Sequence, residues 1–496
     1  MRLETVGTQK TRFARLSRLL WWLVPIFFLF WIYSDGLKTW FMQDDFNWLG
    51  LFRRVHNLRD LPTVLFAPAA QGTIRPWSDR GFFLLFETLF GLNSLPYRIF
   101  AFMTMAADVA LLAWTTRRIT GSPAAGFFAS ILWVANTALL MVMVWSAAYN
   151  QALCLLFLLT AMALFIQYAE TGRRVFWWWQ LVVFTLGFGA LEVNVVYPGL
   201  AAAYVLFVAG TAKRRKLLLS LVPLFCISVA YFLVHFAVAP PLRDGPYAIH
   251  VDGRMFRTLA VYCKWSLLPA KWSELGYSTR MGGAILLIVA VALSAFVFRQ
   301  LTKSPGLVLF FASWFLITIM PVIPLADRHT DYYLTIPLVG LAMLGGFGLS
   351  RVHPGKRRLS AIAATIPLVA YLAGMISVTK VASRQWLDRS LAVRGLVLGV
   401  KAAHETNPGK TIVLDGITSA LYDDAVYMPA FYALGLDNVY LTPGSEDKIH
   451  SAGRPDRLSE LVLDRGTLRN AINHQQVAIY SESGGHLRND TEAWER

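Results

Sequence analysis

The chain has 496 residues, of which 56% are hydrophobic and only 15% are charged. A soluble domain of this length needs a larger share of charged surface residues, so the composition excludes a soluble protein and indicates a polytopic membrane protein. The net charge of +16 does not indicate nucleic-acid binding, because it is confined to one part of the chain. Residues 381–496 carry 12 basic and 15 acidic residues, whereas residues 1–380 carry 34 basic and 15 acidic ones. Such a basic excess is typical of the cytoplasmic loops of membrane proteins.

Eleven apolar runs are long enough to cross a bilayer, which takes about 17–25 residues each. They cover residues 18–34, 97–116, 123–145, 151–169, 175–191, 193–210, 217–238, 281–298, 306–323, 333–350 and 359–379. Six basic clusters precede the first run or fall in every second gap after it, so a cytoplasmic N-terminus satisfies the positive-inside rule at all of them. The sequence therefore predicts a polytopic α-helical membrane protein with about 11 transmembrane helices and an extracytoplasmic C-terminus.

We expect neither residues 255–272 nor the three cysteines to add a membrane span, a disulfide or a metal site. Residues 255–272 are moderately apolar but carry basic residues, and counting them as a span would invert every later loop. We expect an interfacial or re-entrant element there. Cys154, Cys226 and Cys263 lie in apolar surroundings without disulfide or metal-site spacing, which predicts packing residues.

The sequence of residues 381–496, the C-terminal tail, predicts a small soluble domain outside the membrane. Residues 384–403 show helical periodicity, and KTIVLDG, NVYLT and QVAIYSES are typical of short strands between turns. We therefore divide the chain into a multi-spanning domain, residues 1–380, and an extracytoplasmic α/β domain, residues 381–496. Asp423 and Asp424 in the tail predict a solvated helix end, and no motif there indicates chemistry.

The expected topology places most acidic residues of the membrane part on its outer side. These are Asp44, Asp45, Asp60, Asp79, Glu192, Asp244, Asp252, Glu274, Asp327 and Asp331. Acidic residues contribute little to topology, so the asymmetry indicates acidic chemistry or an ion site on the outer face. Asp108 falls within a span, where a carboxyl either has a function or bonds a neighbouring helix.

Four outer stretches carry the candidate chemistry. They are FMQDDFNWL at 41–49, TIRPWSDRGFFLLFETLFGLNSLPYR at 73–98, GALEVNVVYPGL at 189–200 and PLADRHTDYYLTIPLVGL at 324–341. Each also has a structural interpretation, in which arginines reach toward lipid headgroups and Glu192 caps a helix. Together they place carboxylates and guanidinium groups in loops that can converge on one membrane face.

This set resembles the GT-C superfamily of polyprenyl-phosphate-sugar-dependent membrane glycosyltransferases, in particular protein O-mannosyltransferases and bacterial aminoarabinose transferases. MQDDFNW is similar to the acidic pair of their first outer loop, and residues 75–77 (RPW) and 91–96 (GLNSLP) resemble an RPL stretch and a GLNP-like turn. Glu192 matches the Glu of their Lys-Glu turn, and RHTDYYLTIP resembles an Arg-Tyr-Leu-Tyr-Leu-Pro stretch, with HTD as an insertion. The resemblance covers roughly residues 1–350 and none of the tail.

The resemblance implies an inverting glycosyltransferase, of hexosyltransferase type, that moves a sugar from a polyprenyl-phosphate donor to an acceptor hydroxyl on the outer face. Asp44 or Asp45 is expected to be the general base, with Asp44 favoured, and Glu192 to orient the acceptor or share a metal. Arginine side chains suit the leaving phosphate because they form bidentate bonds. The expected substrate-binding residues are Arg75, Arg328, His329, Tyr332 and Asn150. For Asn150 a helix cap is the favoured alternative to a sugar contact.

Cofactors stay open, although a divalent cation on Asp44 and Asp45 would suit their oxygen ligands. The expected partners are a polyprenyl-phosphate-linked sugar, an acceptor that is protein, lipid or polysaccharide, and the lipid bilayer, but no nucleic acid. The expected location is a bacterial inner membrane. Two alternatives are a transporter or flippase of a lipid-linked glycan, and an outer-face glycan polymerase or ligase, for which the loop 243–254 would serve.

Overall fold

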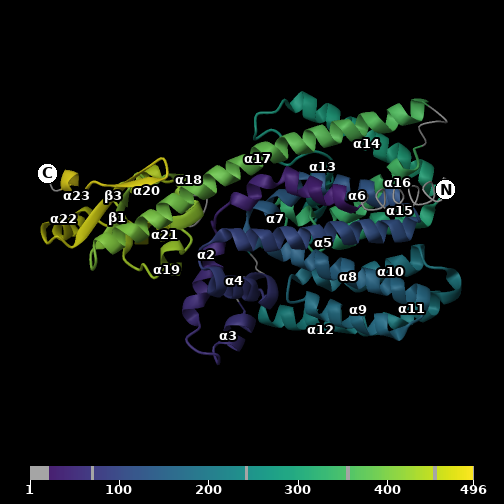
Figure 1. The fold of residues 1–496 in the computed structure, drawn as a ribbon, viewed down its shortest axis with the longest axis horizontal. Helices are drawn as coiled ribbons and strands as arrows, with labels where there is room; N and C mark the ends of the chain where they lie inside the picture. Colours follow the sequence, from purple (N-terminus) through teal and green to yellow (C-terminus); the bar gives the residue numbers. More distant parts are fainter. Residues whose placement is uncertain (1–21, 69–71, 241–243, 353–357, 451–454, 495–496) are drawn as a thin grey trace, which may run out of the picture.

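The computed structural model describes residues 22–68, 72–240, 244–352, 358–450 and 455–494. The molecule is elongated, with a bundle of roughly parallel helices at one end and a small α/β unit at the other (Figure 1). One long helix, α17 (Arg358–Thr406), runs from the bundle into the α/β unit. The sequence-based fold class, a helical membrane protein with a small C-terminal α/β part, is confirmed.

Within the described residues, five helical segments are long and apolar enough to cross a membrane, or six if a pair bent by 63° counts as one. The five comprise α5 (Ser94–Thr120), α8 (Tyr149–Thr171, in the segment Ser146–Thr171), α11 and α12 (Arg214–Ser220 and Val222–Val238), α14 (Thr279–Leu301) and α17. The bent pair comprises α6 (Pro123–Ala135) and the segment Thr137–Val144, which includes α7 (Leu140–Val144). Shorter helices are Trp22–Ile32, α9 (Arg174–Gly187), α10 (Tyr197–Phe207), α15 (Pro305–Ile319) and α16 (Leu338–Ser350). Helices thus occupy the described part of every predicted span, while eleven crossings remain a prediction.

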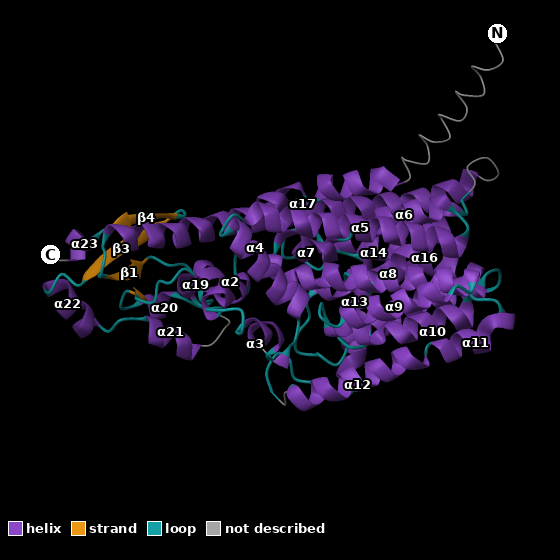
Figure 2. Ribbon diagram, turned by 60° about the horizontal axis from the view of Figure 1, so that its bottom comes forward, coloured by secondary structure: helices purple, strands orange, loops and turns teal. Residues whose placement is uncertain are grey.

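Ordinary capping chemistry sets the ends of these helices. The side chain of Asn93 accepts a hydrogen bond from the amide of Leu95 at the start of α5, and Gly121 ends the helix with a φ of 69°. Where α6 crosses α16, a glycine brings the backbones together, because a Cβ at Gly346 would lie 2.4 Å from the carbonyl oxygen of Ala125. Small residues allow this close packing in membrane helices, and α5, α6, α8 and α16 lie side by side in Figure 2.

Four other helices belong to the segments between the predicted spans. They are α2 (Asp45–Leu49), α3 (Leu61–Phe66), α4 (Phe82–Phe90) and α13 (Arg254–Leu267). The segment 255–272 is therefore helical over most of its length, and its position relative to the bilayer remains a prediction.

The α/β unit has a four-stranded sheet in the order β2-β1-β3-β4. The strands are β1 (Thr411–Asp415), β2 (Val439–Leu441), β3 (Val477–Ser483) and β4 (His486–Asn489). The short helices around it are α18 (Ser419–Leu421), α19 (Ala430–Ala433), α20 (Ser445–Lys448), α21 (Pro455–Leu461), α22 (Arg465–Asn473) and α23 (Thr491–Trp494). β1 pairs parallel with β2 and β3, which are the three predicted strands, whereas β4 pairs antiparallel with β3. Gly484 and Gly485 both have positive φ and form the tight turn before β4.

The predicted last span and the predicted helix at 384–403 form a single helix, α17, of 49 residues. At 1.5 Å per residue it is roughly 70 Å long. No glycine or proline falls between residues 375 and 394, so nothing in the sequence ends the helix where the apolar run stops. The expected boundary between residues 380 and 381 therefore lies inside a continuous helix.

Two sequence-based expectations are wrong. Asp424 exposes only 1% of its surface, so it is no solvated helix end, because Arg389 neutralises its charge in an ion pair of 2.7 Å. Of the three cysteines only Cys154 is buried, whereas Cys226 and Cys263 are exposed. The composition around a cysteine could not show which face of its helix it occupies.

Candidate active site

Asp45 is a buried anchor of the first outer loop. It begins α2 and exposes none of its surface. One carboxylate oxygen accepts a hydrogen bond from the amide of Met42 at 3.1 Å, and the other accepts one from the amide of Ala147 at 2.7 Å. Burial raises the pKa of Asp45 to about 7, although the positive charge of Arg98 opposes the shift. Both oxygens are thus engaged in holding the loop against the turn 146–148.

Asp44 is the accessible member of the pair. It is half-buried, and its Oδ1 accepts only a long contact of 3.5 Å from Asn47 Nδ2. Burial raises its pKa, and the positive charge of Arg328 acts against that increase. A carboxylate with a raised pKa and open oxygens has the properties of a general base.

The second and third outer stretches meet in an ion-pair cluster. Arg75 donates to Glu192 through Nε at 2.9 and 3.1 Å and through Nη2 at 2.8 Å, and its Nη1 lies 3.3 Å from Asp79. The amide of Trp77 also donates to the carbonyl of Gly189 at 2.9 Å, which ties the two stretches together. The convergence predicted for Arg75 and Glu192 is therefore present, with the two side chains paired to each other.

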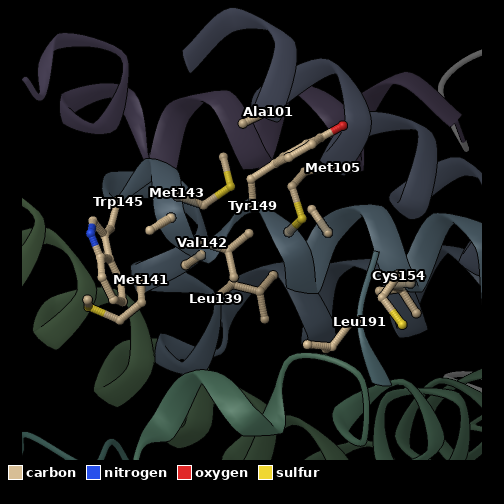
Figure 3. Packing of buried hydrophobic residues seen from close by; sticks show 14 of the residues in the cluster. Ala101, Met105, Leu139, Met141, Val142, Met143, Trp145, Tyr149, Cys154 and Leu191 are labelled. Atoms are coloured by element: carbon tan, nitrogen blue, oxygen red, sulfur yellow. The ribbon is translucent and has the colours of Figure 1, made fainter. Parts of the chain in front are cut away.

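Asn150 joins this cluster to the first loop. Its Nδ2 donates to Asp79 Oδ1 at 3.3 Å and to the carbonyl of Ala147 at 3.1 Å, and the amide of Ala147 binds Asp45. The favoured interpretation of Asn150 as a helix cap is wrong, because Ala148 occupies the N-cap position of α8. On either side of this turn in the sequence, Met141, Met143, Trp145 and Tyr149 pack in the apolar core of the bundle (Figure 3).

Arg328 and Tyr247 lie within electrostatic range of Asp44. The guanidinium of Arg328 lies over the ring of Tyr247, 4.4 Å from its centre, and Arg328 Nε is buried without a hydrogen-bond partner among the described residues. Burial raises the pKa of Tyr247, the charge of Arg328 lowers it, and the charge of Asp44 raises it further. The two charges therefore flank this tyrosine, leaving a guanidinium donor free for an anion.

The two other candidates from the fourth stretch differ in their surroundings. Tyr332 stacks edge-on against Tyr333, with ring centres 4.9 Å apart, and burial raises its pKa beside Arg328. His329 is turned toward α13, where its Nε2 lies 3.3 Å from Thr258 Oγ1 and its ring packs near Tyr262. Tyr332 thus lies beside the guanidinium of Arg328, whereas His329 packs against α13.

Two residues of the site escaped the sequence-based prediction. Asp79 was counted only among the outer acids, although its spacing of four residues from Arg75 was a usable signal for a pair on one helical face. Tyr247 gave no signal, because it lies in a loop far in sequence from every partner. For metals, the described chain contains no group of three or more His, Cys, Asp or Glu arranged to hold an ion. Because Asp45 is engaged on both oxygens, Asp44 offers the open carboxylate for any cation.

Comparisons with known proteins show the fold. The structure is similar to that of ArnT from Cupriavidus metallidurans bound to undecaprenyl phosphate, with a TM-score of 0.50, 12% sequence identity and coverage of 93% of this chain and 92% of that one. Arabinofuranosyltransferase AftD from Mycobacteria matches with a TM-score of 0.49 and 13% identity, over 94% of this chain and 36% of that one. No protein-family model and no curated protein sequence matches the chain. The GT-C-type fold expected from the sequence is thereby confirmed.

Proposed function

We propose that this protein is a glycosyltransferase of the GT-C type that moves a sugar from a polyprenyl-phosphate donor to an acceptor hydroxyl on the outer membrane face. The observation that carries the proposal is the open carboxylate of Asp44 beside the partly unpaired guanidinium of Arg328. The fold it shares with ArnT, whose structure holds undecaprenyl phosphate, supports the choice of donor. A site on the outer face of a bacterial inner membrane is part of the proposal.

Asp44 acts as the base in this reaction. The acceptor oxygen attacks the anomeric carbon, its proton passes to the Asp44 carboxylate, and the bond from that carbon to the phosphate oxygen breaks. Attack opposite the leaving group inverts the anomeric configuration. Asp45 cannot share this role without giving up its bonds to the amides of Met42 and Ala147.

Arg328 holds the leaving phosphate, because its free donor and positive charge suit the charge that develops on the departing oxygen. Arg75 was expected to share that task, but its bonds to Glu192 and Asp79 favour a framework role. The pair Arg75–Glu192 then fixes the wall of the site, and Asn150 links that wall to the loop of Asp44. Tyr332 lies beside Arg328 and supports the position of its guanidinium.

Sugar transfer by purified protein in lipid vesicles tests the assignment, with Asp44→Asn and Asp45→Asn compared in the same assay. We expect Asp44→Asn to fold normally, bind donor and lose transfer by about 10²–10⁴-fold, the contribution typical of general base catalysis. Asp45→Asn should lower thermal stability, because an amide cannot accept from both backbone N–H groups. Full transfer by Asp44→Asn would refute the base.

A further inference from the structure

The α/β unit lies directly on the loop that carries Asp44. The amide of Trp40 donates to Ser390 Oγ on α17 at 3.1 Å, and Arg53 lies over the ring of Tyr432, 4.6 Å from its centre. Arg53 also pairs with Asp437 at 3.5 Å. Residues on both sides of the acidic pair thus contact the C-terminal part of the chain, although no sequence motif connects them.

A two-point contact joins Gln43 to Asp424. The amide of Gln43 donates to the carbonyl of Asp424 at 2.8 Å, and Gln43 Nε2 donates to Asp424 Oδ1 at 2.8 Å. Arg389 of α17 donates to the same carboxylate in three contacts of 2.7–3.0 Å. Asp424 is almost fully buried, so its charge depends on these partners.

Gln43 holds an unusual backbone conformation at this contact. Its φ is 53°, in the left-handed region that non-glycine residues rarely adopt. Such a conformation persists only where the surroundings fix it, and here both the amide and the side chain of Gln43 are bonded to Asp424. Because Asp44 follows directly, the direction of its side chain depends on this turn.

We infer that Asp424 is a positioning residue: through Gln43, the C-terminal α/β unit sets the position of the Asp44 carboxylate. This inference rests on the proposed function of Asp44 as the base. The tail thereby has a task in catalysis, with Arg389 holding the Asp424 carboxylate in place. Misplacement of a catalytic group by about 1 Å can cost about 100-fold in rate.

A pair of substitutions tests this contact. Gln43→Glu places a second carboxylate against Asp424 Oδ1, and like charges at that distance repel. We expect kcat for sugar transfer to fall about 10–100-fold with little change in the donor KM. Asp424→Asn in the same chain supplies an amide that donates to the new Glu, so the double variant should recover most of the activity. Gln475→Glu is the matched control, because Gln475 has the same φ of 53° but is exposed.

Amide hydrogen exchange of residues 40–50 is measured on the same preparations. Faster exchange in Gln43→Glu, restored in the double variant and absent in the Gln475→Glu control, is the expected result. Wild-type kcat in Gln43→Glu, or a double variant as slow as the single one, would overturn the inference while the proposed function stands. If the wild type transfers no sugar, the proposed function fails, and unchanged exchange in Gln43→Glu would then overturn the contact as well.

Discussion

Replacing Glu192 by Gln tests whether Arg75 is fixed by a partly buried ion pair. Glu192 receives three contacts of 2.8–3.1 Å from Arg75, and the two side chains expose 23% and 21% of their surface. A hydrogen bond to a charged group contributes about 1.5–3 kcal/mol, and Gln retains one acceptor oxygen while losing the other oxygen and the charge. We therefore expect the free energy of unfolding to fall by about 2–3 kcal/mol.

The pair Arg118–Glu170 provides a matched control, because it has the same two-point geometry at the surface. Its contacts are 2.6–3.0 Å, but Arg118 and Glu170 expose 52% and 32% of their side chains. Exposed pairs contribute about 0–1 kcal/mol, so Glu170→Gln should have little effect. Thermal unfolding of both variants in the same detergent, with tryptophan fluorescence as the readout, compares their stabilities. Equal midpoints for Glu192→Gln and Glu170→Gln would refute the argument that burial makes the first pair stronger.

Three further predictions concern the loop, its support and the phosphate. Burial raises the pKa of Asp45 from 3.8 to about 7, so the folded protein holds a proton that the unfolded chain releases between these values. The contribution of Asp45 to stability should therefore be greatest below about pH 4 and fall as the pH rises toward 7. The difference in unfolding midpoint between wild type and Asp45→Asn should follow that slope, and a difference that does not change with pH would contradict the assignment. Gly189→Ala places a Cβ 2.1 Å from Trp77 Nε1 and should lower the free energy of unfolding by about 1–3 kcal/mol. Gly210→Ala is the control, because a Cβ there has no other atom within 4 Å among the described residues. Equal unfolding midpoints for the two variants would count against the contact between Gly189 and Trp77. Arg328→Gln should weaken polyprenyl-phosphate binding at least about tenfold in a titration, since truncating one side of a charged contact costs about 2–5 kcal/mol, and unchanged affinity would remove Arg328 from the phosphate site.

The fold was predictable because it depends on local patterns. Apolar runs predicted where the helices of the bundle lie, and short β-branched stretches predicted β1, β2 and β3. The antiparallel β4 was missed, since His486–Asn489 is polar and forms a strand only by pairing with β3. The continuity of α17 was missed because the apolar pattern ends before the helix does.

The sequence predicted which loops form the site, but it could not predict which hydrogen bonds and ion pairs connect them. The sequence favoured Asp44 over Asp45 without the structural reason, because that reason is a hydrogen bond to the amide of Ala147, 102 residues from Asp45. The burial of Asp424 likewise depends on Arg389, 35 residues earlier, and on Gln43, 381 residues earlier. Such contacts follow from tertiary packing, which no local pattern records.

The most direct test of the central claim is the release of polyprenyl phosphate by the wild-type protein in lipid vesicles. A panel of polyprenyl-phosphate sugars is supplied with and without hydroxyl acceptors, and Asp44→Asn serves as the matched blank. We expect wild type to release polyprenyl phosphate from at least one donor only when an acceptor is present. Asp44→Asn should release about 100-fold less while binding the donor equally well. Equal release by wild type and Asp44→Asn would contradict this expectation.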